Sequence, residues 1–410
     1  MEIFPFKGVG RKNLKAFSFA AMLNDTGEEM YAPYLPFFAK TFLGAGPLQY
    51  GLIESSAEAI NRILRAVTGA IADRIGRKRP VILGYVLIAL SRIFLTLAAF
   101  WVHLIPIRML RQIGRSLRDP AREASITDSI ETPMRGKAFG LLEAVDTIGS
   151  ALGPALGIII LSLIAFGAIN FKKEFSENSY RWLFLFAAIP TFISSLIIFK
   201  GLEETLIIKS TKSSEIKGFF DGFKLYFKNK DLVIVTIANC LLAIAATTVQ
   251  MMQFYVYTLP KGTVFVGGVV FILYSVSHFL AAYPGGILAD KFGKSNALSI
   301  ATILVIISLV TLAFAPNAWW AVLPFIIYGM FDSIWIASRR AIVADLAPSD
   351  ARAQTLGNFS FIYGLASMIS PFFFGALAQG LSFRAAFLIC AGVGVLSLGV
   401  LKTFYKGRLK

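Results

Sequence analysis

Five arginines in the segment 108–122 are spaced for one helix face. Steps of three and four residues separate them, and they are Arg108, Arg111, Arg115, Arg118 and Arg122. Placing an arginine near the centre of a bilayer costs about 2.5–3.5 kcal/mol, so this face cannot contact lipid if the segment spans a membrane. It must face water or carboxylates. Guanidinium groups bind carboxylates and phosphates bidentately, which suits either anion recognition or a salt network.

Acidic residues that could meet this face lie in two earlier segments. Asp25, Glu28 and Glu29 share one face of the first segment, and Glu54 and Glu58 share a face of the second with Arg62 and Arg65. Glu58 and Arg62 also have the spacing of an ion pair within one helix.

A buried carboxylate beside an arginine can take up and release a proton, because burial favours the neutral form and the arginine favours the charged form. We expect one of these five carboxylates to carry a proton. Asp25 is the first choice, since it lies about eleven residues into the first segment, near the membrane midplane. A structural salt network is the better expectation for Arg118 and Arg122, whereas Arg111 and Arg115 are expected to act on substrate or proton.

The second half of the chain holds fewer charges within its apolar segments. Asp332 is the only acidic residue deep in such a segment. The number of residues that separates it from Arg115 is the same as that between Asp73 and Asp290, two aspartates of a repeated motif described below. Arg115 and Asp332 are therefore counterparts, and they are predicted to pair across a central pathway and to separate as the protein changes conformation. Polar or aromatic side chains suited to an amphipathic molecule accompany Asp332, and the candidates are Asn239, Tyr274 and Trp335.

The elements that position these residues are predicted to be membrane helices. The chain has 410 residues, 56% of them hydrophobic, and a mean hydropathy of +0.68. A spanning helix needs about 20 apolar residues. Twelve runs qualify: 14–43, 50–72, 81–101, 104–126, 138–166, 181–200, 232–258, 264–289, 296–315, 319–345, 355–380 and 383–404. The prediction is an all-α integral membrane protein with six helices in residues 1–200 and six in residues 232–410.

The net charge of +16 does not indicate nucleic-acid binding. Lysine and arginine gather at both ends of the chain, in two short turns and in the segment 201–231, all on one side of the membrane if twelve helices alternate. This asymmetry predicts that both termini are cytoplasmic in the cell membrane. The segment 201–231 is expected to be a cytoplasmic linker with an amphipathic helix. Two histidines exclude a multi-histidine metal site.

A motif that occurs twice shows that the halves are related. It has the form G-x-x-x-D-[RK]-x-G-[RK], and its copies hold Gly69, Asp73, Arg74, Gly76 and Arg77, then Gly286, Asp290, Lys291, Gly293 and Lys294. The offset between these copies also relates Arg122 to Arg339, Asp128 to Asp345 and Pro154 to Pro371. An internal repeat in an apolar chain is typical of secondary transporters.

Twelve helices in two halves, with GAIADRIGRK and GGILADKFGK after the second helix of each half, resemble the major facilitator superfamily over essentially the whole chain. The fourth segment is similar to the family pattern R-x-x-x-G-x-G-x-G, although Gln112 and Ser116 replace two of its glycines. The fifth segment fits the motif G-x-x-x-G-P-x-x-G of antiporters and drug exporters in this family, and its residues are Gly149, Gly153, Pro154 and Gly157.

The resemblance implies a secondary transporter that works by alternating access, and the repeated aspartates Asp73 and Asp290 are expected to latch one side of it. Two functions remain open: a proton-coupled exporter of amphipathic compounds, or an uptake or exchange carrier for an anionic metabolite. A membrane enzyme or receptor lacks support, because the chain shows no nucleotide-binding loop, metal cluster or nucleophile with a base. We expect a monomer without a cofactor, driven by an ion gradient.

Overall fold

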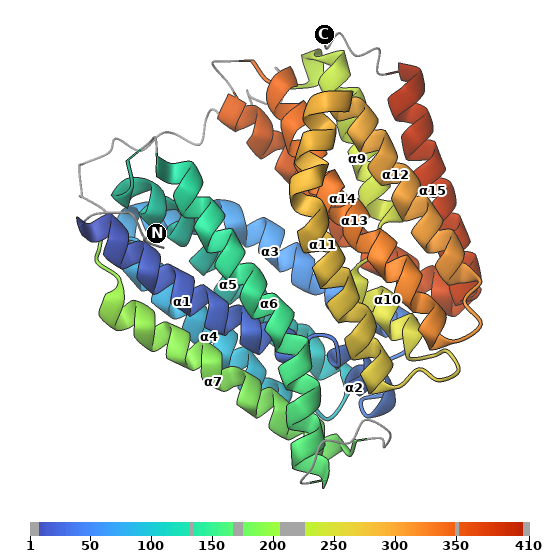
Figure 1. Cartoon of the computed structure of the whole chain (residues 1–410), viewed down its shortest axis with the longest axis horizontal. Helices are drawn as coiled ribbons and strands as arrows, with labels where there is room; N and C mark the ends of the chain where they lie inside the picture. Colours follow the sequence, from blue (N-terminus) through green and yellow to red (C-terminus); the bar gives the residue numbers. More distant parts are fainter. Residues whose placement is uncertain (1–7, 132–133, 167–174, 206–225, 349–351, 405–410) are drawn as a thin grey trace. The chain divides into compact units, whose positions relative to one another are not determined.

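The computed structural model describes residues 8–131, 134–166, 175–205, 226–348 and 352–404, and these parts are helices joined by short connections (Figure 1). The described residues belong to two compact units. Met1–Ala45 and Ser56–Thr211 form the N-terminal unit, and Gly46–Ser55 and Lys212–Lys410 form the C-terminal unit. Most of the predicted linker 201–231, including its amphipathic helix, lies outside the described residues.

The N-terminal half holds seven α-helices among its described residues. They are α1 (Gly8–Tyr31), α2 (Leu35–Thr41), α3 (Pro47–Ile75), α4 (Lys78–Leu95), α5 (Leu104–Ser129), α6 (Arg135–Phe166) and α7 (Glu177–Gly201), with a short 3-10 helix, Trp101–His103, before α5. The first predicted span is divided into α1 and α2 because Pro33 and Pro36 cannot donate the backbone hydrogen bonds of a continuous helix. Counted as one span, α1 and α2 bring this half to six.

The C-terminal half repeats this arrangement. Its described helices are α9 (Lys230–Ala245), α10 (Val249–Val256), α11 (Val264–Phe292), α12 (Lys294–Ala313), α13 (Val322–Leu346), α14 (Arg352–Gly380) and α15 (Phe383–Phe404), and a 3-10 helix, Ala318–Ala321, precedes α13. The first span is broken here too, between α9 and α10, where the Thr248 side chain caps α10 by accepting from the Met251 backbone N–H at 3.3 Å. The chain is thus an all-α membrane protein of six plus six spans.

Hydropathy separates the early spans from the later ones. Eight helical segments of the described chain, from α6 onward, are long and apolar enough to cross a membrane by composition alone. The spans formed by α1 with α2, α3, α4 and α5 are not among them, because charged residues interrupt their apolar sequence. A membrane segment keeps such charges only where they are paired or face water, so these helices must contain the polar site.

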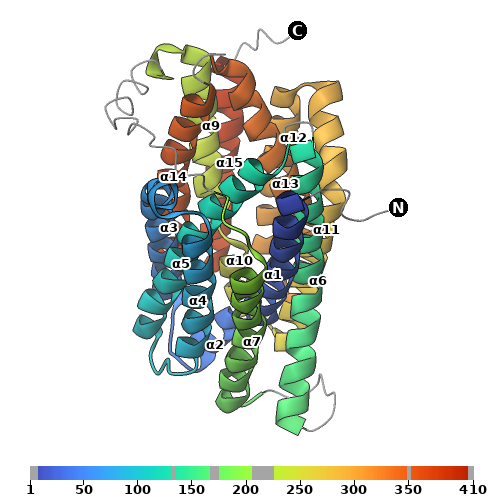
Figure 2. The same cartoon turned by 90° about the vertical axis from the view of Figure 1, so that its left-hand side faces the viewer.

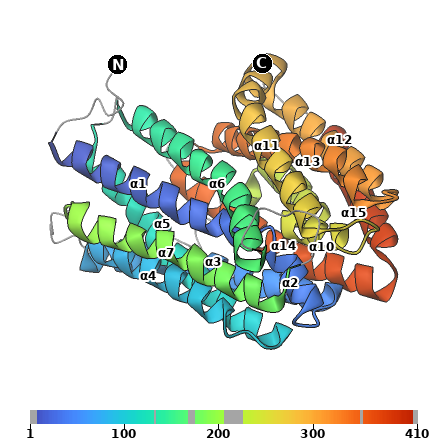
Figure 3. The same cartoon turned by 60° about the horizontal axis from the view of Figure 1, so that its bottom comes forward.

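Packing within the N-terminal unit brings these charged helices together. α1 packs along α6 and α7, while α4 packs along α5 and α7, as the turned views show (Figures 2 and 3). Gly84 of α4 and Gly114 of α5 face one another so closely that a methyl group on Gly84 would lie 2.6 Å from the Gly114 carbonyl oxygen. This contact lets the backbones of α4 and α5 approach closely and holds α5, with its arginine face, against α4.

Candidate functional site

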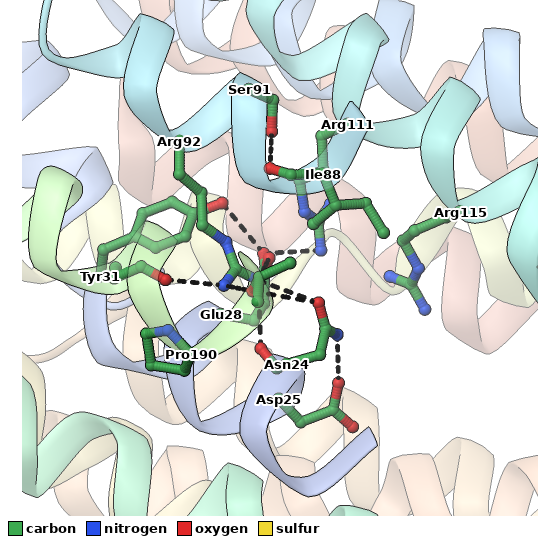
Figure 4. Close-up of polar contacts among 12 residues, drawn as sticks. Asn24, Asp25, Glu28, Tyr31, Ile88, Ser91, Arg92, Arg111, Arg115 and Pro190 are labelled. Atoms are coloured by element: carbon green, nitrogen blue, oxygen red, sulfur yellow. Dashed lines mark hydrogen bonds and ion pairs between the residues drawn. The ribbon is translucent and has the colours of Figure 1, made fainter. Parts of the chain in front are cut away.

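Glu28 of α1 is the centre of a buried charge cluster in the N-terminal unit (Figure 4). Its carboxylate accepts from Arg111 of α5 at 2.6 Å, from Arg92 of α4 at 3.0 Å and from the Tyr31 hydroxyl at 3.2 Å. The predicted meeting of the arginine face with the carboxylates of the first segment is therefore confirmed for Arg111 and Glu28. Two guanidinium groups around one carboxylate hold Glu28 in its charged form.

Arg92 has no solvent exposure and was missed by the sequence analysis. Besides Glu28, it donates to the carbonyl oxygen of Ala187 at 2.9 Å, to the Thr191 hydroxyl and to the carbonyl oxygen of Asn24 at 3.1 Å. It thereby ties α4 to both α1 and α7. The sequence does indicate that Arg92 needs a buried partner, since it is the only charged residue in the apolar run 81–101.

A cavity of about 210 Å³ lies beside this cluster, within the N-terminal unit. The residues that line it are Asn24, Asp25, Glu28, Glu29, Ile88, Arg111, Arg115, Arg118 and Ser150. Three of the five predicted proton-carrying carboxylates are thus brought to one cavity. Glu54 and Glu58 are not among its lining residues.

Asp25 and Glu29 differ from Glu28 in having no ion pair with a described residue. Asp25 accepts one hydrogen bond, from the Asn24 side-chain amide at 2.8 Å. The Oε2 atom of Glu29 is buried without a hydrogen-bond partner. Leaving a buried carboxylate oxygen without a donor is costly. The cavity thus holds one carboxylate paired with two arginines and two carboxyl groups without such a pair.

Three of the remaining arginines of α5 lie near carboxylates other than Glu28, and two of them share Asp119. Arg118 contacts Asp119 at 2.7 Å and Arg122 contacts Asp146 of α6 at 3.5 Å, which agrees with the predicted salt network. Arg115 lies 3.8 Å from Asp119, and its side chain is 42% exposed. Arg108 is buried. Of the five arginines, Arg115 is the one that the cavity leaves most accessible.

The predicted pair in α3 is present, because Arg62 contacts Glu58 at 2.5 Å. The neighbouring residue in α3, Asn61, donates from its side-chain amide to the side-chain oxygen of Gln112 in α5 at 3.2 Å. Gln112 therefore makes a polar contact where the family pattern has a glycine. Glu54 is buried in the first part of α3.

The antiporter-type motif is the surface on which α6 meets α1. A methyl group on Gly153 would lie 2.6 Å from the Cβ atom of Glu29, and methyl groups on Gly149 and Gly157 would overlap with the carbonyl oxygens of Met22 and Met30. The hydroxyl of Tyr34 donates to the Pro154 carbonyl oxygen at 2.6 Å. The motif thus fixes the helix face that bears Asp25 and Glu29.

The repeated turn has the same construction in both halves. Gly76 and Gly293 adopt positive φ angles of 97° and 86°, which glycine tolerates best. Arg77 contacts Asp128 at 3.3 Å, and the equivalent Lys294 contacts Asp345.

The predicted latch is described only in part. Gly69 and Asp73 belong to α3, but the surroundings of Gly69 and the side chain of Asp73 are not described, and Asp290 is exposed. Arg74 and Lys291 are also exposed, and Gly286 has open space around its Cα. Latching by Asp73 and Asp290 stays a prediction.

Glu204, which the sequence analysis did not select, caps the N-terminus of α4. Its carboxylate accepts from the backbone N–H groups of Arg77 at 2.9 Å and of Lys78 at 3.1 Å. We expect Glu204→Ala to cost about 1 kcal/mol and to speed hydrogen exchange of these two amides about fivefold. Mass spectrometry of the peptide that contains them measures this rate. Glu203→Ala is the matched control, since the Glu203 side chain forms an exposed pair with Lys12 and its bonds to Asn13 use the backbone. Equal exchange in both variants would contradict the assignment.

In the C-terminal unit, the polar residues of α13 face α9, α11 and α14. Asp332 accepts from the Tyr274 hydroxyl at 2.9 Å, and Trp335 donates from its indole N–H to Asn239 at 2.9 Å. The proposed pair of Arg115 with Asp332 stays a prediction, because each makes its described contacts within its own unit.

Arg339 shows how the halves have diverged. Its counterpart Arg122 pairs with Asp146, but Tyr363 stands at the position of the second half that is equivalent to Asp146. The Arg339 guanidinium lies 4.3 Å from the ring centre of Tyr363 and 4.6 Å from that of Trp335. The second half thus has a cation–π contact at the position where the first half has an ion pair.

The sequence was compared with known families and proteins. It matches the model of the Major Facilitator Superfamily over residues 17–266 and 261–408. The MFS-type transporter MJ1317 of Methanocaldococcus jannaschii is 26% identical over 374 residues, which cover 89% of this chain and 88% of that protein. The multidrug resistance protein MdtG of Salmonella schwarzengrund is 22% identical over 394 residues, which cover 93% of each.

Solved structures share the fold. The nucleoside transporter NupG superposes with a TM-score of 0.79 at 16% identity, covering 97% of this chain and 100% of that one. A bacterial homologue of the human lysosomal transporter Spinster gives 0.77 at 17% identity, covering 99% of each chain. The family match spans nearly the whole sequence, and its relatives are transporters and not enzymes. The chain therefore belongs to the Major Facilitator Superfamily, as a multi-pass membrane transporter of a small molecule.

Proposed function

We propose that the chain is a proton-coupled exporter of amphipathic compounds, and that Asp25 and Glu29 carry the proton. The observation that carries this proposal is the cavity onto which both carboxyl groups open without an ion pair. Its volume of about 210 Å³ is below the roughly 300–1,000 Å³ of sites for drug-sized ligands. A proton and a few water molecules fit it better than the transported compound does.

The three carboxylates of α1 have two different roles in this proposal. Glu28 is fixed by Arg92 and Arg111 and acts as the permanent counter-charge of the arginines. Asp25 and Glu29 lie one helical turn apart and repel one another when both are charged, so the pair favours holding at least one proton. A change in water access to the cavity would alter that balance and release the proton.

Two further observations support export. The helix-packing motif of antiporters is intact and sets the position of Glu29. The multidrug resistance protein MdtG covers nearly the same length of chain, although at 22% identity. We infer a monomer with both termini in the cytoplasm of the cell that carries it, with no cofactor and with the proton gradient as its energy source.

Removing either free carboxyl group is expected to uncouple transport. In proteoliposomes with an imposed pH gradient, Asp25→Asn and Glu29→Gln should each lose gradient-driven accumulation and keep substrate exchange at equal pH. The reason is that exchange needs only the conformational change, whereas accumulation needs a titrating group. Full accumulation in both variants would reject this assignment, and Thr26→Val, next to Asp25 on the same helix, is the matched control.

Arg115 supports a second candidate function, a carrier for an anionic metabolite. Its side chain is the most exposed of the arginines that line the cavity, and its ion pair with Asp119, at 3.8 Å, is longer than the printed pairs of Arg111 and Arg118. Guanidinium groups in this state bind carboxylate or phosphate well. In the same assay, a panel of organic anions and lipophilic cations separates the two functions, because Arg115→Gln should abolish anion exchange only if the anion is the substrate.

A further inference from the structure

A further group of polar side chains adjoins the cavity of the N-terminal unit. Helices α4, α5 and α6 each place one residue on the cavity wall and a polar residue one turn away on the same helix face. The pairs are Ile88 with Tyr85, Arg118 with Arg122, and Ser150 with Asp146. We call Tyr85, Arg122 and Asp146 the second layer.

Contacts join the second layer across the three helices. Arg122 donates to Asp146 at 3.5 Å, which connects α5 to α6. The Arg118 guanidinium lies 5.0 Å from the ring centre of Tyr85, which connects α5 to α4. The charges of Asp25, on the cavity wall, and of Asp146 both act on Tyr85. Tyr85 therefore lies within electrostatic reach of one carboxyl group in the cavity and of another beyond it.

Several buried polar atoms here have no hydrogen-bond partner among the described residues. They are the hydroxyl oxygen of Tyr85, Oδ1 of Asp146, Nε of Arg122 and Nη1 of Arg118. Buried polar groups are nearly always satisfied in folded proteins, and bound water usually satisfies those that no protein group reaches. Both donors and acceptors are present, and a polar cavity adjoins them. Water is the ligand that fits all four atoms.

The second layer can receive and pass on a proton. A tyrosine hydroxyl donates one hydrogen bond while it accepts others, so it can transmit a proton without a net change. Partial burial favours the neutral form of Asp146, whereas Arg122 favours its charged form. The other charged groups that act on Asp146 are Arg118 of α5, Asp25 of α1 and Glu143 of α6 itself.

We propose that the Tyr85 hydroxyl and bound water conduct a proton from Asp25 in the cavity to Asp146. The carboxyl group of Asp25 gives its proton to water, the Tyr85 hydroxyl accepts one from water as it donates its own, and the carboxylate of Asp146 takes that proton up. Asp25 is then charged, Asp146 is neutral and Tyr85 is unchanged. Arg122 has now lost its ionic partner, which favours release of the proton from Asp146.

This inference rests on the proposed function, in which Asp25 and Glu29 carry the proton, and it names the path by which the proton leaves the cavity. Its test follows the loss of protons from carboxyl groups and needs no transported compound. Infrared absorption of neutral carboxyl groups is recorded on the full-length protein in nanodiscs after a rapid change from about pH 6 to about pH 9, a range in which ordinary carboxyl groups are already charged.

Tyr85→Phe should slow the decay of this absorption about tenfold or more, equal to about 1.4 kcal/mol of barrier. The reason is that the substitution removes the hydroxyl that links the two carboxyl groups. The amplitude should stay the same, since every carboxyl group is kept. Tyr328→Phe is the matched control and should decay at the wild-type rate, because its hydroxyl donates to the Thr247 carbonyl oxygen in the C-terminal unit.

A double variant separates the path from a structural ion pair. Asp146→Asn should also slow the decay, and Asp146→Asn combined with Arg122→Gln should remain slow. If Asp146 served only as the partner of Arg122, the double variant would recover, because it removes both members of the pair. Glu143→Gln is the matched control for Asp146→Asn, since Glu143 is an exposed carboxylate one turn earlier on α6.

Normal decay in Tyr85→Phe, or recovery in the double variant, would overturn the path. Should Tyr85→Phe fail to fold, Asp146→Asn and the double variant decide alone. Full absorption in both Asp25→Asn and Glu29→Gln would reject the proposed function and the path together. Reduced absorption in those two variants, with normal decay in Tyr85→Phe, would keep the proposed proton carriers and reject only the path.

Discussion

Arg92→Leu is expected to lower the unfolding temperature of the purified protein by on the order of 10 °C, the largest stability effect of any substitution considered. Arg92 is fully buried and joins Glu28 and Asn24 of α1 to Ala187 of α7. Its loss leaves a buried carboxylate with one partner fewer. Breaking a buried pair in this way costs about 3–5 kcal/mol, and each kcal/mol lowers the midpoint by about 2–4 °C in a folding unit of about 150–250 residues.

The control for Arg92 is a second arginine of the same unit. Arg115→Leu should change the midpoint by far less, because the Arg115 side chain is 42% exposed. Scanning fluorimetry in detergent measures both. Glu28→Leu combined with Arg92→Leu should be less damaging than the sum of the two single changes, since the double variant removes both members of the Arg92–Glu28 pair, while Arg111 loses Glu28 in the single and the double variant alike. Strictly additive losses would mean that Arg92 acts through packing and not through Glu28.

Gly157→Ala is expected to abolish transport and to lower the yield of folded protein. In the interior of an ordinary helix, a change from glycine to alanine stabilises the helix by about 1 kcal/mol. Here the added methyl group would overlap with the carbonyl oxygen of Met30 in the backbone of α1 and would lie 2.7 Å from the Tyr34 ring. Neither neighbour can move without separating α1 from α6, so the carboxyl groups of α1 would be displaced.

Gly140 supplies a matched control on the same helix. A methyl group there has no neighbour within 4 Å, so Gly140→Ala should keep transport and leave the stability unchanged or slightly higher. Transport in proteoliposomes and the monodisperse fraction after purification are measured for both variants. Normal transport by Gly157→Ala would show that α1 and α6 do not need this close contact.

The architecture was predictable because membrane helices depend on local composition. Long apolar runs and the constant offset between matching residues give the number of helices and the relation between the halves without any knowledge of packing. The spacing of the arginines also located their shared face, and Arg111 does meet Glu28. These inferences use only the period of a helix and the cost of a charge in lipid.

The details of the site depend on contacts between distant segments, which no local pattern records. Helical spacing puts Asp25, Glu28 and Glu29 on one face, but it cannot tell which of them two arginines neutralise. Arg92 settles this, and its other partners are backbone carbonyls and a hydroxyl in segments far from it along the chain. Asp146 as the partner of Arg122 likewise required the packing of α6 on α5.

The replacement of an acid by Tyr363 in the second half bears on how the chain arose. If two identical chains had to assemble into a transporter, every substitution would appear twice, and a carboxylate lost from one half would be lost from both. Fusion into one polypeptide removes that constraint. Arg122 has an ionic partner, whereas Arg339 lies against two rings. Each half of a single polypeptide can therefore hold its own kind of contact at equivalent positions.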